Sequence, residues 1–309
     1  MTKLEFLKPR SFGSRIADVF VFLKQNFKPF SKGLLTITLP VICVYAIVAF
    51  MFYSNYLSLF GMQNRGITPD YTSVMGVFWM LPMYLLVGIT SLFIAVGTLS
   101  YVKFYNEDKE REITSSMLWL EIKRHFWRVL GANLLLGVTI VFAIFIVSLA
   151  TGVLVGGTGV FGGISALFFV FFPLILALIW FSVRIIFSTI FIVIENKSII
   201  QSFKDSYNFT KGIFWKTLGF IVVVTLLVNA VSQIFSLPGV MFMYADMFLG
   251  IGSFARSFGN VLIALGSSVG LILYCVVYIG YAIFYFSEKE QRYGIMANLE
   301  IDKIGSQED

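Results

Sequence analysis

The sequence predicts an all-α integral membrane protein with six transmembrane helices. Of the 309 residues, 58% are hydrophobic and only 13% are charged, whereas a soluble domain carries roughly 25% charged residues. The mean hydropathy is +0.86. Several apolar runs exceed the roughly 20 residues that a helix needs to cross a bilayer, and such long runs favour helices over the alternating strands of a membrane barrel. A soluble globular protein, a disordered chain and a disulfide scaffold are therefore excluded.

Six spans follow from the apolar runs. They are expected at 34–56, 76–101, 129–151, 164–194, 217–236 and 258–286. Pro40, Pro82 and Pro173 fall inside the first, second and fourth spans. We expect a kink at each, because proline removes one backbone hydrogen bond of the helix.

The basic residues predict the orientation of these spans. Twenty of the 23 Lys and Arg residues fall on one side of the predicted bundle, while Arg65 and Arg256 fall on the other and Arg184 lies within the fourth span. Since Lys and Arg accumulate in cytoplasmic loops, both termini are expected in the cytoplasm. The organisation is then a cytoplasmic N-terminal segment, a six-span domain and a cytoplasmic tail, at 1–33, 34–287 and 288–309. Seven basic residues in the first of these predict contact with anionic lipids at the cytoplasmic face.

Three segments on the cytoplasmic side have the periodicity of amphipathic helices. They lie at 12–27, 114–127 and 197–211. In the third, polar residues recur every three or four positions, and the expected apolar face consists of Ile199, Ile200, Phe203, Tyr207 and Thr210. Basic amphipathic helices of this kind lie at the level of the lipid headgroups. The alternative is that they pack against one another beneath the bundle.

An aromatic and basic motif follows each of these segments and opens a span. Its members are Phe126, Trp127 and Arg128 in one copy, Phe214, Trp215 and Lys216 in another, and Asn26, Phe27 and Lys28 in a weaker one. The recurrence predicts a threefold internal pseudo-repeat of interfacial helix, outward span and inward span. The alternative is that these residues are ordinary interfacial anchors, which any membrane protein places at this depth.

Two stretches carry a resemblance to a known family. They read SFGSRIADVFVFLKQNF at 11–27 and VIENKSIIQSFKDSYNFTKGIFWKTLGFIVV at 193–223, with Glu195 as the acid at the end of a span. The sequence resembles the membrane domain fused to some bacterial glycerophosphoryl diester phosphodiesterases, and its stand-alone six-span relatives. The catalytic residues of that family belong to a separate soluble barrel domain, so none is carried over. The resemblance implies a module of the bacterial inner membrane that serves a partner.

Arg184 is the most distinctive candidate for a functional residue. It lies about ten residues, or about 15 Å, from the cytoplasmic end of its span. A cation at this depth is costly and marks a functional site by default. Glu195 lies about three helical turns away, so the expected partner is a backbone carbonyl, a lipid phosphate or an acid of another subunit. The alternative is that Arg184 snorkels to the headgroups.

Polar residues in the last two spans form a second candidate set. Asn229, Gln233 and Asn260 can form hydrogen bonds between helices, or they can line a polar path with Arg184. Gly266 and Gly270 form a GxxxG pattern that lets two helices approach closely. The stretch 237–252 is unusually apolar for an outer loop, which indicates an interfacial or re-entrant segment or a docking surface.

Nothing in the sequence predicts chemistry. The single histidine has no metal-ligating neighbours, and a G-x-G-x-x-G pattern at 157–162 lacks the preceding strand that dinucleotide binding needs. We therefore expect no catalytic activity, no cofactor, no metal and no nucleic-acid partner. The leading hypothesis is a non-catalytic scaffold or subunit of a larger membrane complex, with partner subunits in the membrane. The alternative is a transporter or lipid-handling protein that uses Arg184 and the polar residues of spans five and six.

Overall fold

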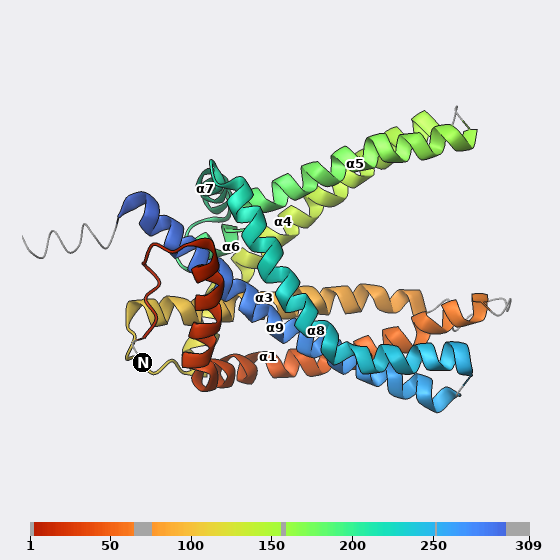
Figure 1. The fold of residues 1–309 in the computed structure, drawn as a ribbon, viewed down its shortest axis with the longest axis horizontal. Coiled ribbons are helices and arrows are strands. Elements are labelled where there is room, and N and C mark those ends of the chain that lie inside the picture. The colour runs from red at the N-terminus through yellow and green to blue at the C-terminus, as the bar shows by residue number, and fades with distance from the viewer. Residues whose placement is uncertain (1–2, 65–75, 156–158, 251, 295–309) are drawn as a thin grey trace, which may run out of the picture. The chain divides into compact units, whose positions relative to one another are not determined.

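A computed structural model describes residues 3–64, 76–155, 159–250 and 252–294, and every regular element in these ranges is helical (Figure 1). The elements are α1 (Phe12–Asn64), the 3-10 turn η1 (Gly76–Trp79), α3 (Met80–Glu107), α4 (Ser115–Val155), α5 (Gly159–Ile185), α6 (Ser188–Val193), α7 (Ile199–Thr210), α8 (Phe214–Leu249) and α9 (Ser253–Tyr293). Within the described ranges, six helices are long and apolar enough to cross a membrane. The predicted all-α architecture is thereby confirmed, with six helices that are candidate membrane spans.

The prolines of the spans have different positions in their helices. Pro29 and Pro40 lie inside α1, and the red start of this helix runs across the direction of its orange remainder (Figure 1). A proline inside a helix removes a hydrogen bond and bends it, which accounts for this change of direction. Pro173 also lies inside its helix, α5. Pro82 lies in the first turn of α3, where the missing N–H has no helical partner anyway, so the reason for expecting a kink there does not apply.

Only one of the three segments with amphipathic periodicity is a separate helix. The segments 12–27 and 114–127 are the first turns of the long helices α1 and α4, whereas α7 is separated from α8 by Gly212. Gly212 has a φ of +85°, a conformation that glycine adopts without steric cost. The buried residues of α7 are Ser202, Ser206, Phe209 and Thr210. Ile200, on the expected apolar face, is 79% exposed, so α7 packs through three hydroxyl residues and Phe209.

The chain forms two compact units. Unit 1 comprises Met1–Ile122 and Ile221–Asp309, and unit 2 comprises Lys123–Phe220. In unit 1, α1, α3 and α9 pack against one another, and α3 is buried throughout 94–102. A Cβ atom on Gly97 of α3 would lie 3.0 Å from Leu34 Cδ1 of α1, so glycine permits this close packing. In unit 2, α6 packs on α7, and the ring centroids of Phe187 and Phe209 are 5.0 Å apart.

A buried ion pair ties the N-terminal part of unit 1 to the end of α9. Arg15 is fully buried, and its Nη2 donates a hydrogen bond to Glu288 Oε1 at 2.6 Å. The guanidinium lies 4.6 Å from the ring centroid of Phe284. Residues 288–293, expected as the beginning of the tail, therefore continue α9, while 295–309 lie outside the described residues. Arg15 was counted among the basic residues of 1–33 expected to contact lipid, but here it is enclosed by protein.

The apolar stretch at 237–252 is mostly the end of α8 rather than a loop. Asp246, near this end, is 4% exposed. Its carboxylate accepts a hydrogen bond from the Gly252 N–H at 3.2 Å and pairs with Arg256 Nε at 2.7 Å. A buried acid thus closes the turn between α8 and α9. The glycine-rich pattern at 157–162 lies partly outside the described residues, and α5 begins within it at Gly159.

Candidate functional site

A polar pocket of about 320 Å³ lies between α1, α8 and α9 of unit 1. Its lining combines three phenols, two amides and three hydroxyls with small and apolar residues. These residues are Tyr45, Tyr53, Asn229, Ser232, Gln233, Ser236, Val240, Ile263, Gly266, Ser267, Gly270, Leu271 and Tyr274. All of them belong to helices with the length and hydropathy of membrane spans. The lining that the structure describes carries no acidic or basic side chain.

Helical spacing explains why these side chains meet. Asn229, Ser232, Gln233 and Ser236 follow one another at steps of three, one and three, which places them on a single face of α8. The lining residues of α9 recur at three- and four-residue steps from Ile263 to Tyr274 in the same way. The structure therefore brings Asn229 and Gln233, both singled out from the sequence, to one site.

Three donors in the pocket, those of Asn229, Ser232 and Ser267, bond to carbonyls of their own helices. Asn229 Nδ2 donates to the Thr225 carbonyl at 2.8 Å, and Ser232 Oγ donates to the Val228 carbonyl at 2.8 Å. Tyr45 Oη donates to Ser267 Oγ at 3.2 Å, which links α1 to α9. Gln233 is exposed and forms no side-chain hydrogen bond within the described residues. Its amide and the remaining oxygen acceptors are available to a molecule that enters the pocket.

Two glycines bring α9 against the polar face of α8. A Cβ atom on Gly266 would lie 2.6 Å from the Phe235 carbonyl oxygen and from Ser236 Oγ. A Cβ atom on Gly270 would lie 3.3 Å from Ser232 Cβ. Contacts below 3.0 Å require the backbone to move, so a larger residue at Gly266 separates the helices that form the pocket.

Asn260 lies one turn before the pocket on α9 and is not among its lining residues. It is 2% exposed, and its Nδ2 donates to Ser54 Oγ at 3.4 Å. Its Oδ1 has no hydrogen-bond partner within the described part of the chain. Asn260 therefore connects α9 to α1 rather than extending the pocket lining.

Arg184 has different surroundings, in unit 2. It lies in the last turn of α5, where a cation complements the negative end of the helix dipole. Its guanidinium carbon is 5.3 Å from the ring centroid of Trp180, 5.0 Å from Tyr207 and 5.6 Å from Phe214. Within the described residues no acid pairs with it. Three aromatic rings thus surround the cation, and contact with a lipid phosphate or with an acid of another subunit stays a prediction.

The packing of α7 fixes the backbone at this point. Ser206 Oγ of α7 donates a hydrogen bond to the Arg184 carbonyl at 2.8 Å. This carbonyl lies next to the end of α5 at Ile185, where carbonyls lack helical partners. The buried serine therefore satisfies a group that the helix end exposes, and it holds Tyr207 beside the guanidinium.

Glu195 is part of an ion-pair cluster rather than a partner of Arg184. Lys197 Nζ lies 2.6 Å from Glu195 Oε2 and 2.8 Å from Asp205 Oδ2. Partial burial lowers the pKa of Lys197, but its hydrogen bonds to Asp205 and Glu195 outweigh this effect, so the pKa is raised above the ordinary 10.5. The sequence places Lys197 on the polar side of the amphipathic segment 197–211 and does not reveal these two partners.

The aromatic and basic motifs of unit 2 have matching local geometry. Trp127 is 74% exposed and Trp215 is 79% exposed. Each packs edge-on against the preceding phenylalanine at 5.3 Å, with interplanar angles of 82° for Phe126–Trp127 and 83° for Phe214–Trp215. Arg128 Nη1 donates to Asn196 Oδ1 at 2.8 Å. Exposed tryptophans suit interfacial anchors, whereas the threefold pseudo-repeat stays a prediction.

The sequence did not reveal the tyrosines of the pocket. Tyr45, Tyr53 and Tyr274 lie within apolar runs, where a tyrosine is easily read as part of the hydrophobic face. The available signal is chemical, because a phenol in a membrane span needs a hydrogen-bond partner or a polar cavity. Within the described residues, no group of three His, Cys, Asp or Glu side chains gathers where it could hold a metal ion.

Six long apolar helices, with polar groups gathered inside one unit, define a multi-pass membrane protein. The chain belongs to the family described as a domain of unknown function (DUF7847), whose model matches residues 30–288. Neither the curated proteins nor the solved structures contain a match to the chain. The family match includes the polar pocket and Arg184. It does not support the resemblance to the phosphodiesterase membrane domain, which stays a prediction.

Proposed function

We propose that the protein is a membrane transporter whose polar pocket takes up a small, uncharged molecule that carries hydroxyl groups. The observation that carries the proposal is the pocket itself, about 320 Å³ of space lined by phenols, amides and hydroxyls within membrane-spanning helices. Polar side chains within a span are costly, and those that face a cavity mark substrate pathways.

The chemistry of the lining supports a neutral ligand. A charged molecule would lose its hydration without meeting an opposite charge, because the described lining residues are uncharged. Hydroxyl groups can both donate to and accept from the amides of Asn229 and Gln233. If these residues served only to hold helices together, their side chains would fill the space between the helices instead of facing a cavity.

Glycerol flux tests this proposal. The full chain is reconstituted in liposomes, and the vesicles are shrunk in hyperosmotic glycerol, so that the rate of reswelling reports glycerol entry. We expect the wild type to reswell faster than protein-free vesicles, and the double variant Asn229→Leu/Gln233→Leu to lose most of that difference. Asn133→Leu is the matched control. Asn133 Nδ2 also donates to the carbonyl four residues earlier at 2.8 Å, but it lies on α4, outside the pocket.

Arg184 provides a further arm of the same experiment. Its guanidinium is surrounded by rings of unit 2, so Arg184→Ala is expected to leave the glycerol rate unchanged. A wild type no faster than empty vesicles, or a double variant as fast as the wild type, would overturn the proposal. A loss of rate in Arg184→Ala would instead favour the sequence-based hypothesis that includes Arg184 in the transport site.

The scaffold hypothesis remains the competing proposal. It is supported by the wide apolar face of α4, on which Leu134, Val138, Val141 and Phe142 are each more than half exposed. Lipid covers such a face as readily as a partner subunit does, so isolation from the native membrane is needed. A stoichiometric partner protein cross-linked to α4 would support the scaffold, whereas a protein isolated alone with glycerol flux would support transport.

The orientation belongs to the same proposal. Both termini are proposed to face the cytoplasm, with the N-terminal segment against anionic lipid, on the strength of the positive-inside distribution. Single cysteines introduced at Lys24 and Phe254, both exposed, test it in right-side-out vesicles of a variant whose native cysteines are replaced by serine. A membrane-impermeant maleimide is expected to label the cysteine at 254 and to spare the one at 24.

A further inference from the structure

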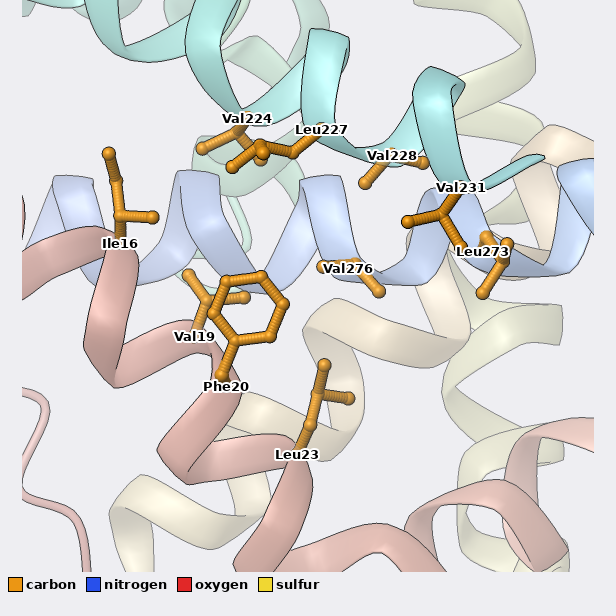
Figure 2. Close-up of a pocket in the computed structure, with 10 residues that line it drawn as sticks. All are labelled: Ile16, Val19, Phe20, Leu23, Val224, Leu227, Val228, Val231, Leu273 and Val276. Carbon is orange, nitrogen blue, oxygen red and sulfur yellow. The ribbon is translucent and has the colours of Figure 1, made fainter. Parts of the chain in front are cut away.

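An apolar groove of about 250 Å³ lies in unit 1 between the first turns of α1, the middle of α8 and α9. Figure 2 shows Val19 and Phe20 of α1 pointing toward Val224 and Leu227 of α8, with Val276 of α9 behind them. Every lining side chain is aliphatic or, in the case of Phe20, aromatic. The groove shares no lining residue with the polar pocket.

The groove has a closed floor and an open rim. Val19, Val224 and Val228 are at most 5% exposed and form the floor. Phe20 and Leu227, at 53% and 43%, are exposed on the rim. A site with this lining offers no hydrogen bond, so only a hydrocarbon surface can occupy it without loss of polar contacts.

Basic side chains follow the rim along α1. Lys24 and Lys28 come four and eight residues after Phe20, so they lie on the same helical face, with about 6 Å of rise between successive members. Both are exposed, and neither forms an ion pair within the described part of the chain. The nearby Arg15 is already neutralised by Glu288, and Arg10 pairs with Asp18. The positive charge beside the groove therefore comes from the two lysines.

We infer that the groove binds one acyl chain of an anionic phospholipid, whose phosphate is held by Lys24 and Lys28. The occupant is a lipid of the leaflet that surrounds the start of α1. Its chain covers the exposed rim at Phe20 and Leu227, and its headgroup lies over the face that carries the lysines. A zwitterionic lipid can fill the groove but gains less from the lysines. The site is independent of the polar pocket and of the transport that we assign to it.

Photolabelling locates the lipid chain. The full protein is reconstituted with phosphatidylglycerol that carries a diazirine in one acyl chain, and the labelled residues are identified by mass spectrometry. We expect label on Phe20, Leu227 and their groove neighbours to exceed, at least threefold, the label on the exposed face of α4. Equal labelling of α4 residues such as Val138 would show that lipid only coats the helices, and it would overturn the inference.

Lipid retention tests the lysines. Native mass spectrometry compares phosphatidylglycerol with phosphatidylcholine retained by the wild type and by Lys24→Gln/Lys28→Gln. Each lysine near the surface is worth about 1 kcal/mol toward an anionic lipid, so the preference for phosphatidylglycerol should fall roughly fivefold per lysine. Lys204→Gln, an exposed lysine of α7, is the control. An unchanged preference in the double variant would contradict the inference.

A bulky substitution tests the groove without changing charge. Val228→Phe fills the floor and should lower the retention of both lipids, whereas Val222→Phe, on the same helix but outside the groove and 43% exposed, should not. If Val228→Phe fails to fold, the lysine variants still decide the matter, because their side chains are on the surface. Glycerol flux measured on the same samples separates failure of this site from failure of the polar pocket.

Discussion

Two arginines placed among apolar helices show two ways of enclosing a cation. In unit 1, Arg15 is fully buried and pairs with Glu288 at 2.6 Å. In unit 2, Arg184 is partly exposed and lies between three aromatic rings at 5.0 to 5.6 Å. An ion pair neutralises the charge of the arginine, but neither partner can then be removed without leaving the other charged and buried. Rings stabilise the cation more weakly and leave its charge uncompensated.

The difference has a consequence for where each residue can act. Arg15 has no net charge to offer, so its role is to fix the start of α1 against the end of α9. Arg184 keeps its charge in the last turn of α5, where the helix dipole favours it. Substitutions at the partners of these two arginines test the contrast.

Removing one partner of the buried ion pair should have the largest effect. Glu288→Ala leaves Arg15 charged and buried, which is expected to cost about 3–5 kcal/mol in the free energy of unfolding. The change is measured by unfolding in mixed SDS and mild-detergent micelles. Glu5→Ala is the control, because Glu5 and its partner Lys109 are 59% and 37% exposed, and such pairs contribute at most about 1 kcal/mol. If the two variants lost equal amounts of unfolding free energy, burial of the Arg15–Glu288 pair would not make it more important than an exposed pair.

Replacing both partners should recover most of this loss. Arg15→Met/Glu288→Leu removes both charges while keeping side chains of similar length, and apolar replacements of buried ion pairs are often neutral or stabilising by about 1–4 kcal/mol. We therefore expect the double variant to unfold nearer to the wild type than to Glu288→Ala. A double variant as unstable as the single one would mean that the hydrogen bond to Gln291, at 3.3 Å, matters more than the charge.

Removing one ring beside Arg184 should have a smaller effect. Tyr207→Leu takes away a ring 5.0 Å from the guanidinium, and a partly desolvated cation–π contact is worth about 1–2 kcal/mol. Tyr84→Leu is the control, since Tyr84 is also an exposed tyrosine but lies on α3. If Arg184→Met removes the difference between the two tyrosine variants, the loss belongs to the cation–π contact. If the difference persists, the rings stabilise the fold by packing alone.

The ion-pair cluster around Lys197 should give the smallest effect, and one that depends on pH. Its pKa is raised above 10.5, so its contribution to stability is complete below pH 10.5 and is lost as the pH rises through the higher folded value. The free energy of unfolding of the wild type should exceed that of Lys197→Gln by up to about 1 kcal/mol at neutral pH. This difference should shrink above pH 10.5. Lys204→Gln should show no such trend, and a difference constant to pH 12 would contradict the assignment.

The sequence was sufficient to predict the spans, because each is a property of a local run of residues. It also brought Asn229 and Gln233 into one candidate set, since both are polar residues within the same apolar span. It could not reveal that Tyr45 lies opposite Ser267, 222 positions along the chain. Packing between distant helices depends on the shapes of whole side-chain surfaces, and a single sequence holds no local signal for it.

Two acids illustrate the same limit. Glu288 was assigned to a cytoplasmic tail and Asp246 to an apolar outer stretch, yet both are buried and paired with arginines. An acidic residue lowers the hydropathy of a run, so a span predicted from hydropathy ends before it. A helix can continue past that point when a cation from another segment accompanies the acid, as Arg15 and Arg256 do here. Arg184 shows a related limit, because the sequence did not reveal that rings from three helices lie beside it.

The pairing of Arg15 with Glu288 has a consequence for how the chain is made. The two residues are separated by 273 positions, and a ribosome adds about 5–20 residues each second. Arg15 is therefore synthesised roughly 14 to 55 s before its partner. During this interval the first turns of α1 cannot take their final place, although the later spans are already entering the bilayer. The buried pair can therefore form only after α9 has been translated as far as Glu288.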